Sequence, residues 1–299
     1  MRARASQVRP PVTTRVSHAA LAGVGRRIVL VTHRRSGTHL TIDLLRRQFA
    51  DCDGRKRFGE PLHALYLNLD LLLHERRPLG EARALELLRR ARRPIVKTHA
   101  LPGFAAFRPD HAAFVDALLA DADVYAVHRD GRDVMCSLHL YFQAFDPRAR
   151  CSLSQFLRQT DDGLSRPRRW SDHVLRWRAR EGVRSLAYEQ VVGSPRAVLA
   201  RLANELALEP RLVKPLLPPR LRGAWHARWL RLASRRPPVT TVLSDPSGRR
   251  RPARWREAFG PEDRAFFHRE AGDALVELGY ESSDAWIHEP SADSELAGP

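Results

Sequence analysis

Short apolar runs alternate with stretches of helical spacing along most of the chain. Four segments have the length and composition of buried strands: Ile28 to Val31, Ile95 to His99, Val124 to Val127 and Val183 to Tyr188. Helical spacing predicts helices over residues 40–49, 80–93 and 110–120, a segment ending at 142, and residues 167–181, 194–207 and 261–278. Strands that alternate with helices predict an α/β fold with a mostly parallel central sheet flanked by helices.

The domain organisation follows from where this alternation begins and ends. The 299 residues suit one large α/β domain or two small ones, and we expect a single domain over residues 27–283. Residues 1–26 contain no acidic residue and are predicted to be a disordered basic tail, and residues 284–299 a flexible tail. The proline-rich segment 210–250 breaks the alternation and is predicted to be a mobile cap. In the helix expected over residues 80–93, Leu85, Leu88 and Ala91 would share the buried face.

Three polar clusters follow predicted strands directly, at residues 32–39, 97–99 and 129–137. The carboxyl ends of parallel strands lie at one edge of a sheet, and ligands of such folds gather there. The sequence therefore places candidate chemistry at that edge.

The first cluster, Arg35-Ser36-Gly37-Thr38-His39, lies between a strand and a helix. Such a turn presents backbone N–H groups to an anion at the positive end of the helix dipole, and the two hydroxyls and the arginine add donors. The GxxxxGK[ST] motif of nucleotide triphosphatases is absent, because none of the three lysines has that context. Taken alone, the turn is equally compatible with a purely structural role.

The other two clusters supply a candidate base and further anion contacts. His99 ends a predicted strand and is a candidate general base, since the ordinary pKa of histidine is about 6.5. Lys97 lies on the same side of that strand and could stabilise charge on a leaving oxygen. Arg129 follows a strand, and Ser137 lies in the next helix, so both could reach one phosphate. In isolation each of these residues could also be incidental or structural.

Composition narrows the range of functions. The formal charge is +17, yet 48 of the 51 basic residues are arginines spread along the chain, which favours a basic solvated surface over a nucleic-acid site. The three cysteines have no CxxC spacing, so we expect no disulfide framework, no metal site and a reducing, cytoplasmic setting. The longest apolar stretch, residues 64–73, is interrupted by Asn68 and Asp70 and is too short for a membrane span.

Together these segments resemble the cytosolic-type sulfotransferases. Thr32 to Leu40 is similar to their YPKSGTxW loop, and Lys97-Thr98-His99 with Leu101-Pro102 is similar to their KTHLP segment. The stretch from His128-Arg129 through Ser137 to His139 and Phe142 resembles RNPKDVxVSxYHF, and Tyr188-Glu189 resembles YEDL. The terminal RKGxxGDW stretch is matched by Gly248-Arg249-Arg250-Arg251, Trp255-Arg256, Phe259 and Pro261-Glu262-Asp263. The five segments occur in the family's order between about residues 27 and 281.

The resemblance implies a role for each matching position. His99 would be the base that deprotonates the acceptor, with Lys97 and Arg35 assisting the reaction. A P-loop-like turn of Arg35, Ser36, Gly37, Thr38 and His39 would bind the 5′-phosphosulfate of 3′-phosphoadenylyl sulfate. The 3′-phosphate and the adenine of that donor would be bound by Arg129, Ser137, Tyr188, Arg249, Arg250 and Arg251.

The chain departs from the family pattern at three places. Leu40 replaces the usual tryptophan beside adenine, and Arg35 replaces a lysine. The terminal motif lacks its usual glycine, so which of the three arginines binds the phosphate stays open.

The function implied is in-line sulfuryl transfer to a hydroxyl or amine of a small-molecule or glycoconjugate acceptor, without a metal. The acceptor would lie near Phe104, Phe107 and Phe142, although these rings could equally belong to the core. Two alternatives remain: a catalytically inactive sulfotransferase-like protein that binds the nucleotide, and a nucleic-acid binder that uses the basic surface.

Overall fold

Five parallel strands form the centre of the fold, in the order β2-β3-β1-β4-β7. Their bounds are β2 Leu67–Asn68, β3 Ile95–Thr98, β1 Arg27–Thr32, β4 Ala122–His128 and β7 Val183–Ala187. The computed structural model describes residues 21–73, 78–104, 109–216, 229, 232, 234–240 and 253–289. The four strands expected from the sequence are present, and the predicted α/β class with a parallel sheet is confirmed.

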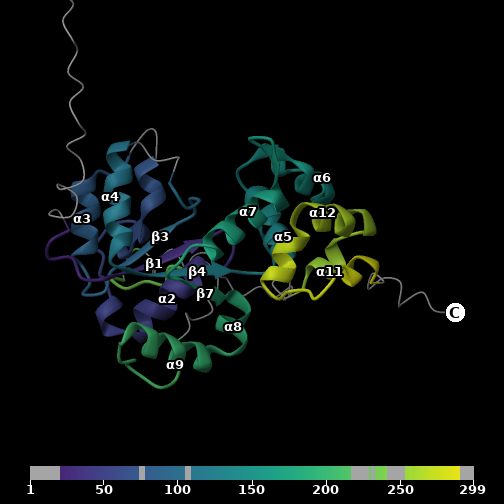
Figure 1. Cartoon of the computed structure of the whole chain (residues 1–299). Coiled ribbons are helices and arrows are strands. Elements are labelled where there is room, and N and C mark those ends of the chain that lie inside the picture. Colours follow the sequence, from purple (N-terminus) through teal and green to yellow (C-terminus); the bar gives the residue numbers. More distant parts are fainter. Residues whose placement is uncertain are drawn as a thin grey trace, which may run out of the picture.

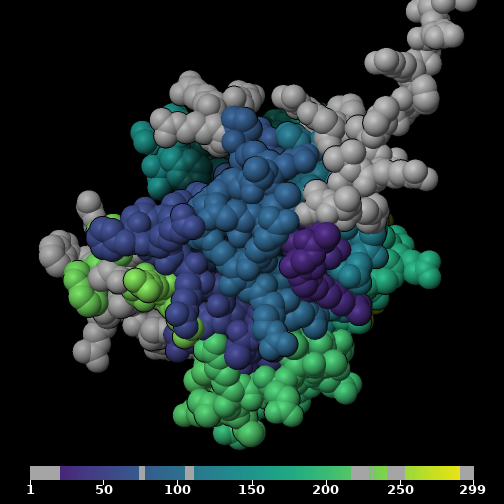
Figure 2. Space-filling model, turned by 90° about the vertical axis from the view of Figure 1, so that its left-hand side faces the viewer, coloured from purple at the N-terminus to yellow at the C-terminus, as the bar shows by residue number. Residues whose placement is uncertain are grey.

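Helices cover both faces of this sheet (Figure 1). The face that carries Val29, Val31 and Val96 packs against α3 (Glu81–Leu88), α4 (Pro109–Ala120) and α7 (Arg166–Arg178). The opposite face, with Ile28 and Leu30, packs against α2 (Thr38–Gln48), α8 (Tyr188–Gly193) and α9 (Pro195–Leu206). In the view of Figure 2, α3 and α4 (blue) lie above α9 (green). Because strand residues alternate between two apolar layers, nearly every position of β1 is fully buried.

A third apolar cluster lies beside the sheet and joins segments that are distant in sequence. It contains α5 (Gly131–Phe142), α6 (Leu153–Arg158), α11 (Trp255–Ala258) and α12 (Pro261–Glu277). The guanidinium of Arg132 lies over the rings of Trp255 and Trp286, at 3.8 and 4.5 Å. The remaining short elements are η1 Ala50–Cys52, η2 Leu62–Leu65, η3 Leu69–Leu73, η4 Pro147–Ala149, η5 Ala285–His288 and the hairpin of β5 Thr160–Asp161 with β6 Leu164–Ser165.

The helix predicted over residues 80–93 is shorter than expected, because α3 ends at Leu88. The backbone N–H of Arg93 donates to Asp51 O, and its side chain donates to Asp123, so the arginine-rich segment is held by tertiary contacts outside the helix. The buried face of α3 consists of Ala84, Leu87 and Leu88, whereas Ala91 lies beyond its end. The expected face was therefore wrong at Ala91.

The described residues nearest the two ends of the chain pack against the domain. Leu21 is buried in the core, and Arg26 donates a hydrogen bond to Asp123 at 3.0 Å. Leu21 and Arg26 both fall within residues 1–26, the expected N-terminal tail. In the expected C-terminal tail, Trp286 is buried against Trp255. Most of the predicted mobile cap, and the outer parts of both tails, lie outside the described residues. Within the described part of the chain, no helix is long and apolar enough to cross a bilayer.

Candidate active site

The turn between β1 and α2 has the form of an anion site. Gly37 is the residue before α2, with φ of 97°, and no side chain caps the first N–H groups of that helix. A Cβ added at Gly37 would lie 2.4 Å from Cδ2 of Tyr188, so both backbone conformation and space require glycine. The hydroxyl of Ser36 is fully buried and has no hydrogen-bond partner among the described residues. These uncapped and unpartnered donors fit an anion.

Thr32 joins this turn to the candidate base. Its hydroxyl lies 2.7 Å from the hydroxyl of Thr38, and its backbone oxygen lies 2.6 Å from Nδ1 of His99. Because a carbonyl oxygen only accepts, Nδ1 of His99 must carry the proton and donate it. The other ring nitrogen, Nε2, therefore holds the lone pair, as a general base requires. Thr38 also has a backbone N–H in the first turn of α2, which is a further donor for an anion.

The surroundings of His99 keep its imidazole neutral. Burial, and after it the positive charge of Lys97, lower the pKa of His99 to about 3, although Asp70 and the Thr32 carbonyl oppose this change. Burial also lowers the pKa of Lys97, against the attraction of Asp70. At neutral pH the imidazole of His99 is therefore unprotonated at Nε2.

Asp70, at the start of η3, is a site residue that the sequence analysis noted only as an interruption of an apolar stretch. Its carboxylate accepts three hydrogen bonds from three consecutive residues: Lys97 Nζ at 2.9 Å, Thr98 Oγ1 at 2.8 Å and the backbone N–H of His99 at 3.0 Å. Burial alone would raise the pKa of Asp70, but Lys97 and His99 outweigh it and hold that pKa below its usual value. One carboxylate thus fixes the end of β3.

Arg35 connects the turn to α5. Its Nε donates to Ser137 Oγ at 3.1 Å, and its guanidinium lies 4.9 Å from the ring centre of Tyr141. The backbone of Arg35 is left-handed, with φ of 69°, which is uncommon for a residue with a side chain. The structure thereby brings together two of the residues predicted to contact the donor.

Arg129 reaches the same turn from the end of β4. Its guanidinium lies 4.6 Å from the ring centre of Tyr188, and the same ring lies against Gly37. One nitrogen donates to Asp133 at 3.2 Å, while Nε is buried and has no partner within the described residues. Arg129, Tyr188 and the turn therefore form one continuous surface.

Other predicted residues lie apart from this cluster. His39 contacts the hydroxyl of Tyr66 at 3.4 Å, and Phe104 is buried against Trp177. Phe142 packs with other phenylalanine rings beside α6. Phe107 and the arginines of the terminal motif, Arg249, Arg250 and Arg251, lie outside the described residues.

The comparisons with known proteins agree with the resemblance seen in the sequence. A family model of the sulfotransferase domain matches residues 25–210, which is more than half of the chain. No curated protein matches the sequence. Among solved structures, mouse sulfotransferase SULT7A1 complexed with PAP is similar, at 18% identity over 87% of this chain and 89% of that one, with a TM-score of 0.49. Retinol dehydratase in complex with androsterone and the inactive cofactor PAP is similar at 18% identity over 83% and 80%, with a TM-score of 0.43. On the extent of the family match, the chain belongs to the sulfotransferase-domain family.

Proposed function

We propose that this protein transfers the sulfuryl group of 3′-phosphoadenylyl sulfate to a hydroxyl or amine, with His99 as the general base. The observation that carries the proposal is the position of Thr32, which hydrogen-bonds both to the anion turn and to Nδ1 of His99. A base and an anion site that share one residue are held at a fixed separation, and such positioning is the main requirement of an in-line group transfer.

The donor would supply an activated sulfuryl group attached to a phosphate leaving group. The first N–H groups of α2 and the buried hydroxyl of Ser36 would bind its 5′-phosphosulfate. Arg129 and Ser137 would bind the 3′-phosphate, with the ring of Tyr188 beside them. Arg35 contacts Ser137 and lies in the turn, so its charge is available to both anionic groups.

The acceptor would be deprotonated at Nε2 of His99. Lys97 contributes by keeping the imidazole neutral, and its own charge is balanced by Asp70. The charge of Lys97 would also stabilise the leaving phosphate oxygen. We infer a small-molecule or glycoconjugate acceptor, in a cytoplasmic setting.

A second candidate is a protein that binds the same donor without turnover. The pKa of His99, at about 3, favours this candidate, because a general base works best when its pKa lies near the working pH. The ion pair between Lys97 and Asp70 also favours it, since that pair turns the ammonium toward Asp70.

One experiment separates the two candidates. The purified protein is incubated with donor labelled with radioactive sulfur and with a panel of phenols, steroids, amines, sugars and glycolipids, and calorimetry measures donor binding in parallel. Transfer to at least one acceptor, lost in His99→Ala while donor binding persists, supports the enzyme. Tight donor binding with no transfer supports the inactive binder. Absence of donor binding overturns both.

A further inference from the structure

A small cavity of about 60 Å³ lies between the C-terminal half of α2 and residues 236–238. Its volume is several times the 10–15 Å³, roughly, that one water needs, and far below the roughly 300–1,000 Å³ of sites for nucleotide-sized molecules. The cavity therefore has room for a small polyatomic ion. Its charged lining consists of Arg46, Arg47, Arg211, Arg236, Asp43 and Asp53, and we call it the arginine cavity.

Both carboxylates of the arginine cavity already have several partners. Asp43 is fully buried and accepts from two consecutive backbone N–H groups, at 2.8 and 2.6 Å, and from the hydroxyl of Thr240 at 2.6 Å. One oxygen of Asp53 accepts from both Arg211, at 2.7 Å, and Arg236, at 3.0 Å. Since four guanidinium groups face only these two carboxylates, the lining has an excess of positive charge.

The two arginines of α2 keep donors that no described residue uses. Arg46 is 4% exposed, and its terminal nitrogens donate at 3.3–3.5 Å to Asp43 and to the backbone oxygens of Pro237 and Gly54. Its Nε is buried without a partner among the described residues, and so is Nε of Arg47. A buried donor of a charged group without an acceptor is unfavourable, so both side chains are suited to receive an anion.

The excess of positive charge acts on Arg46 itself. Burial lowers the pKa of Arg46, Asp43 and Asp53 oppose this change, and the positive charge of Arg236 adds to it. The negative end of the α2 dipole accounts for arginines in the last turn of that helix. It does not account for the two arginines that come from later segments, and an anion in the cavity would account for all four.

We propose that the arginine cavity binds a tetrahedral oxyanion, inorganic phosphate or sulfate, between its four guanidinium groups. A planar guanidinium presents paired N–H groups that match two oxygens of such an anion. Pro237 and Pro238 form the rest of the wall and have no backbone N–H, so donors on that side come from the arginines. The bound anion joins α2 to Arg211, which follows α9, and to Arg236.

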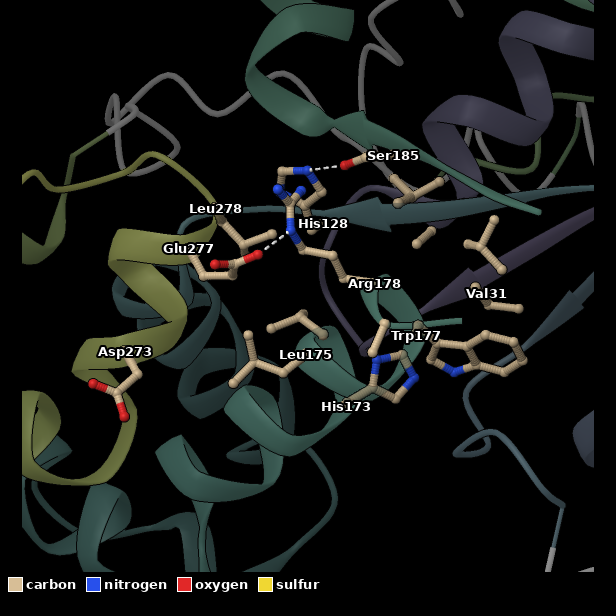
Figure 3. Close-up of a pocket in the computed structure, with 15 residues that line it drawn as sticks. Val31, His128, His173, Leu175, Trp177, Arg178, Ser185, Asp273, Glu277 and Leu278 are labelled. Atoms are coloured by element: carbon tan, nitrogen blue, oxygen red, sulfur yellow. Dashed lines mark hydrogen bonds and ion pairs between the residues drawn. The ribbon is translucent and has the colours of Figure 1, made fainter. Parts of the chain in front are cut away.

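This site is separate from the candidate donor site and from the larger cavity of the protein. Arg46 lies eight residues after Thr38, about 12 Å farther along α2. The cavity of about 600 Å³ drawn in Figure 3 lies beside α7, on the opposite face of the sheet from α2. Among the described residues, the arginine cavity shares no lining residue with that cavity or with the turn at 35–39. A nucleotide at the turn and an oxyanion here can therefore be bound together.

The test is calorimetric titration of the full chain with inorganic phosphate and, separately, with sulfate, at an ionic strength held constant with sodium chloride. Saturating adenosine 3′,5′-bisphosphate is present, so that phosphate does not report on the donor site. We expect one saturable oxyanion per chain. Arg47→Gln should weaken its binding about tenfold, because a charge-assisted hydrogen bond is lost. Arg269→Gln is the matched control: Arg269 is 67% exposed, pairs with Glu270 and does not line the cavity, so affinity should be unchanged.

Thermal unfolding gives a second readout. A ligand that binds only the folded chain raises the melting temperature as its concentration increases, so phosphate should raise it more than chloride at equal ionic strength. This rise should be smaller in Arg47→Gln and in Arg236→Gln than in the control, and Arg47→Gln alone decides if Arg236→Gln does not fold.

Three results would each overturn the proposal: no saturable binding of either oxyanion, equal affinity in Arg47→Gln and the control, or loss of phosphate binding when the bisphosphate saturates. If the bisphosphate itself does not bind, the proposed function fails, while the comparison of Arg47→Gln with the control still tests the arginine cavity. None of these readouts needs sulfuryl transfer.

Discussion

Replacing Asp70 by asparagine should destabilise the protein and weaken the candidate base together. The carboxylate is the described partner of the buried ammonium of Lys97, at 2.9 Å, and it also accepts from Thr98 and from the backbone of His99. In Asp70→Asn, one amide oxygen can still accept from Thr98 and His99. The amide NH₂ would then face Nζ of Lys97, which is itself a donor.

The expected loss of stability in Asp70→Asn follows from how deeply the side chains of Asp70 and Lys97 are buried. Removing one partner of a buried ion pair costs about 3–5 kcal/mol. The side chain of Lys97 is 7% exposed and that of Asp70 is 24% exposed, so we take the lower end, about 3 kcal/mol. For a domain of this size, that corresponds to a fall in melting temperature of about 6–12 °C.

The assay is thermal and urea-induced unfolding of four proteins: the wild type, Asp70→Asn, Lys97→Met and the double variant. The double variant should be more stable than the sum of the single changes implies, by about 1–3 kcal/mol, because it leaves no uncompensated charge. Asp162→Asn is the matched control, since Asp162 pairs with Arg169 at a side-chain exposure of 93%, and its stability should not change measurably.

Activity gives a second readout of the same change. Asp70 raises the pKa of His99, so its loss should make the imidazole a weaker base and lower kcat while donor affinity is retained. Additive losses of stability in the double variant would refute the coupling between Asp70 and Lys97. An unchanged kcat in folded Asp70→Asn would refute the effect on His99.

Three more predictions concern the donor, the base and pH. Arg129→Ala should weaken binding of adenosine 3′,5′-bisphosphate by about 1.5–3 kcal/mol and leave AMP binding nearly unchanged, because only the bisphosphate carries the 3′-phosphate; equal losses by calorimetry would contradict this. His99→Ala should lower turnover by about two to four orders of magnitude with donor binding retained, and an unchanged rate in steady-state assays would exclude the base. Burial lowers the pKa of His33 and of His128 to about 4, and that of His99 to about 3, in the folded protein. The unfolded chain therefore binds more protons below about pH 6.5, and urea unfolding should show stability falling from there toward about pH 4, by up to about 1.4 kcal/mol per pH unit for each histidine. Constant stability between pH 7 and 5 would contradict that sign.

The parts of the fold predicted correctly depend on local pattern. Ile28 to Val31 is an apolar run that only a strand covered on both faces accommodates, and the turn after it needs glycine at Gly37 because of its left-handed backbone. Pattern was enough to place His99 at the end of a strand. The same pattern did not predict which residues of other elements lie beside His99.

Asp70 shows why the rest could not be read from the sequence. It lies 27 residues before Lys97 in the chain, and it reaches β3 only because the two-residue strand β2 pairs with Val96 and Lys97. A strand of two residues has no periodicity to detect. A single acidic residue inside an apolar stretch was the available signal, and in such surroundings a carboxylate needs a partner.

The low pKa of His99 has a consequence for the order of events. In the protein alone, burial and the charge of Lys97 hold this pKa at about 3, so the imidazole is neutral but a weak base. An anionic group within about 4–6 Å favours the protonated form and raises a pKa by about 1–3 units. The turn that would hold such an anion is joined to His99 through Thr32. Under the proposed function, His99 becomes an effective base only when the donor is bound, so that an acceptor is deprotonated beside the group that it attacks.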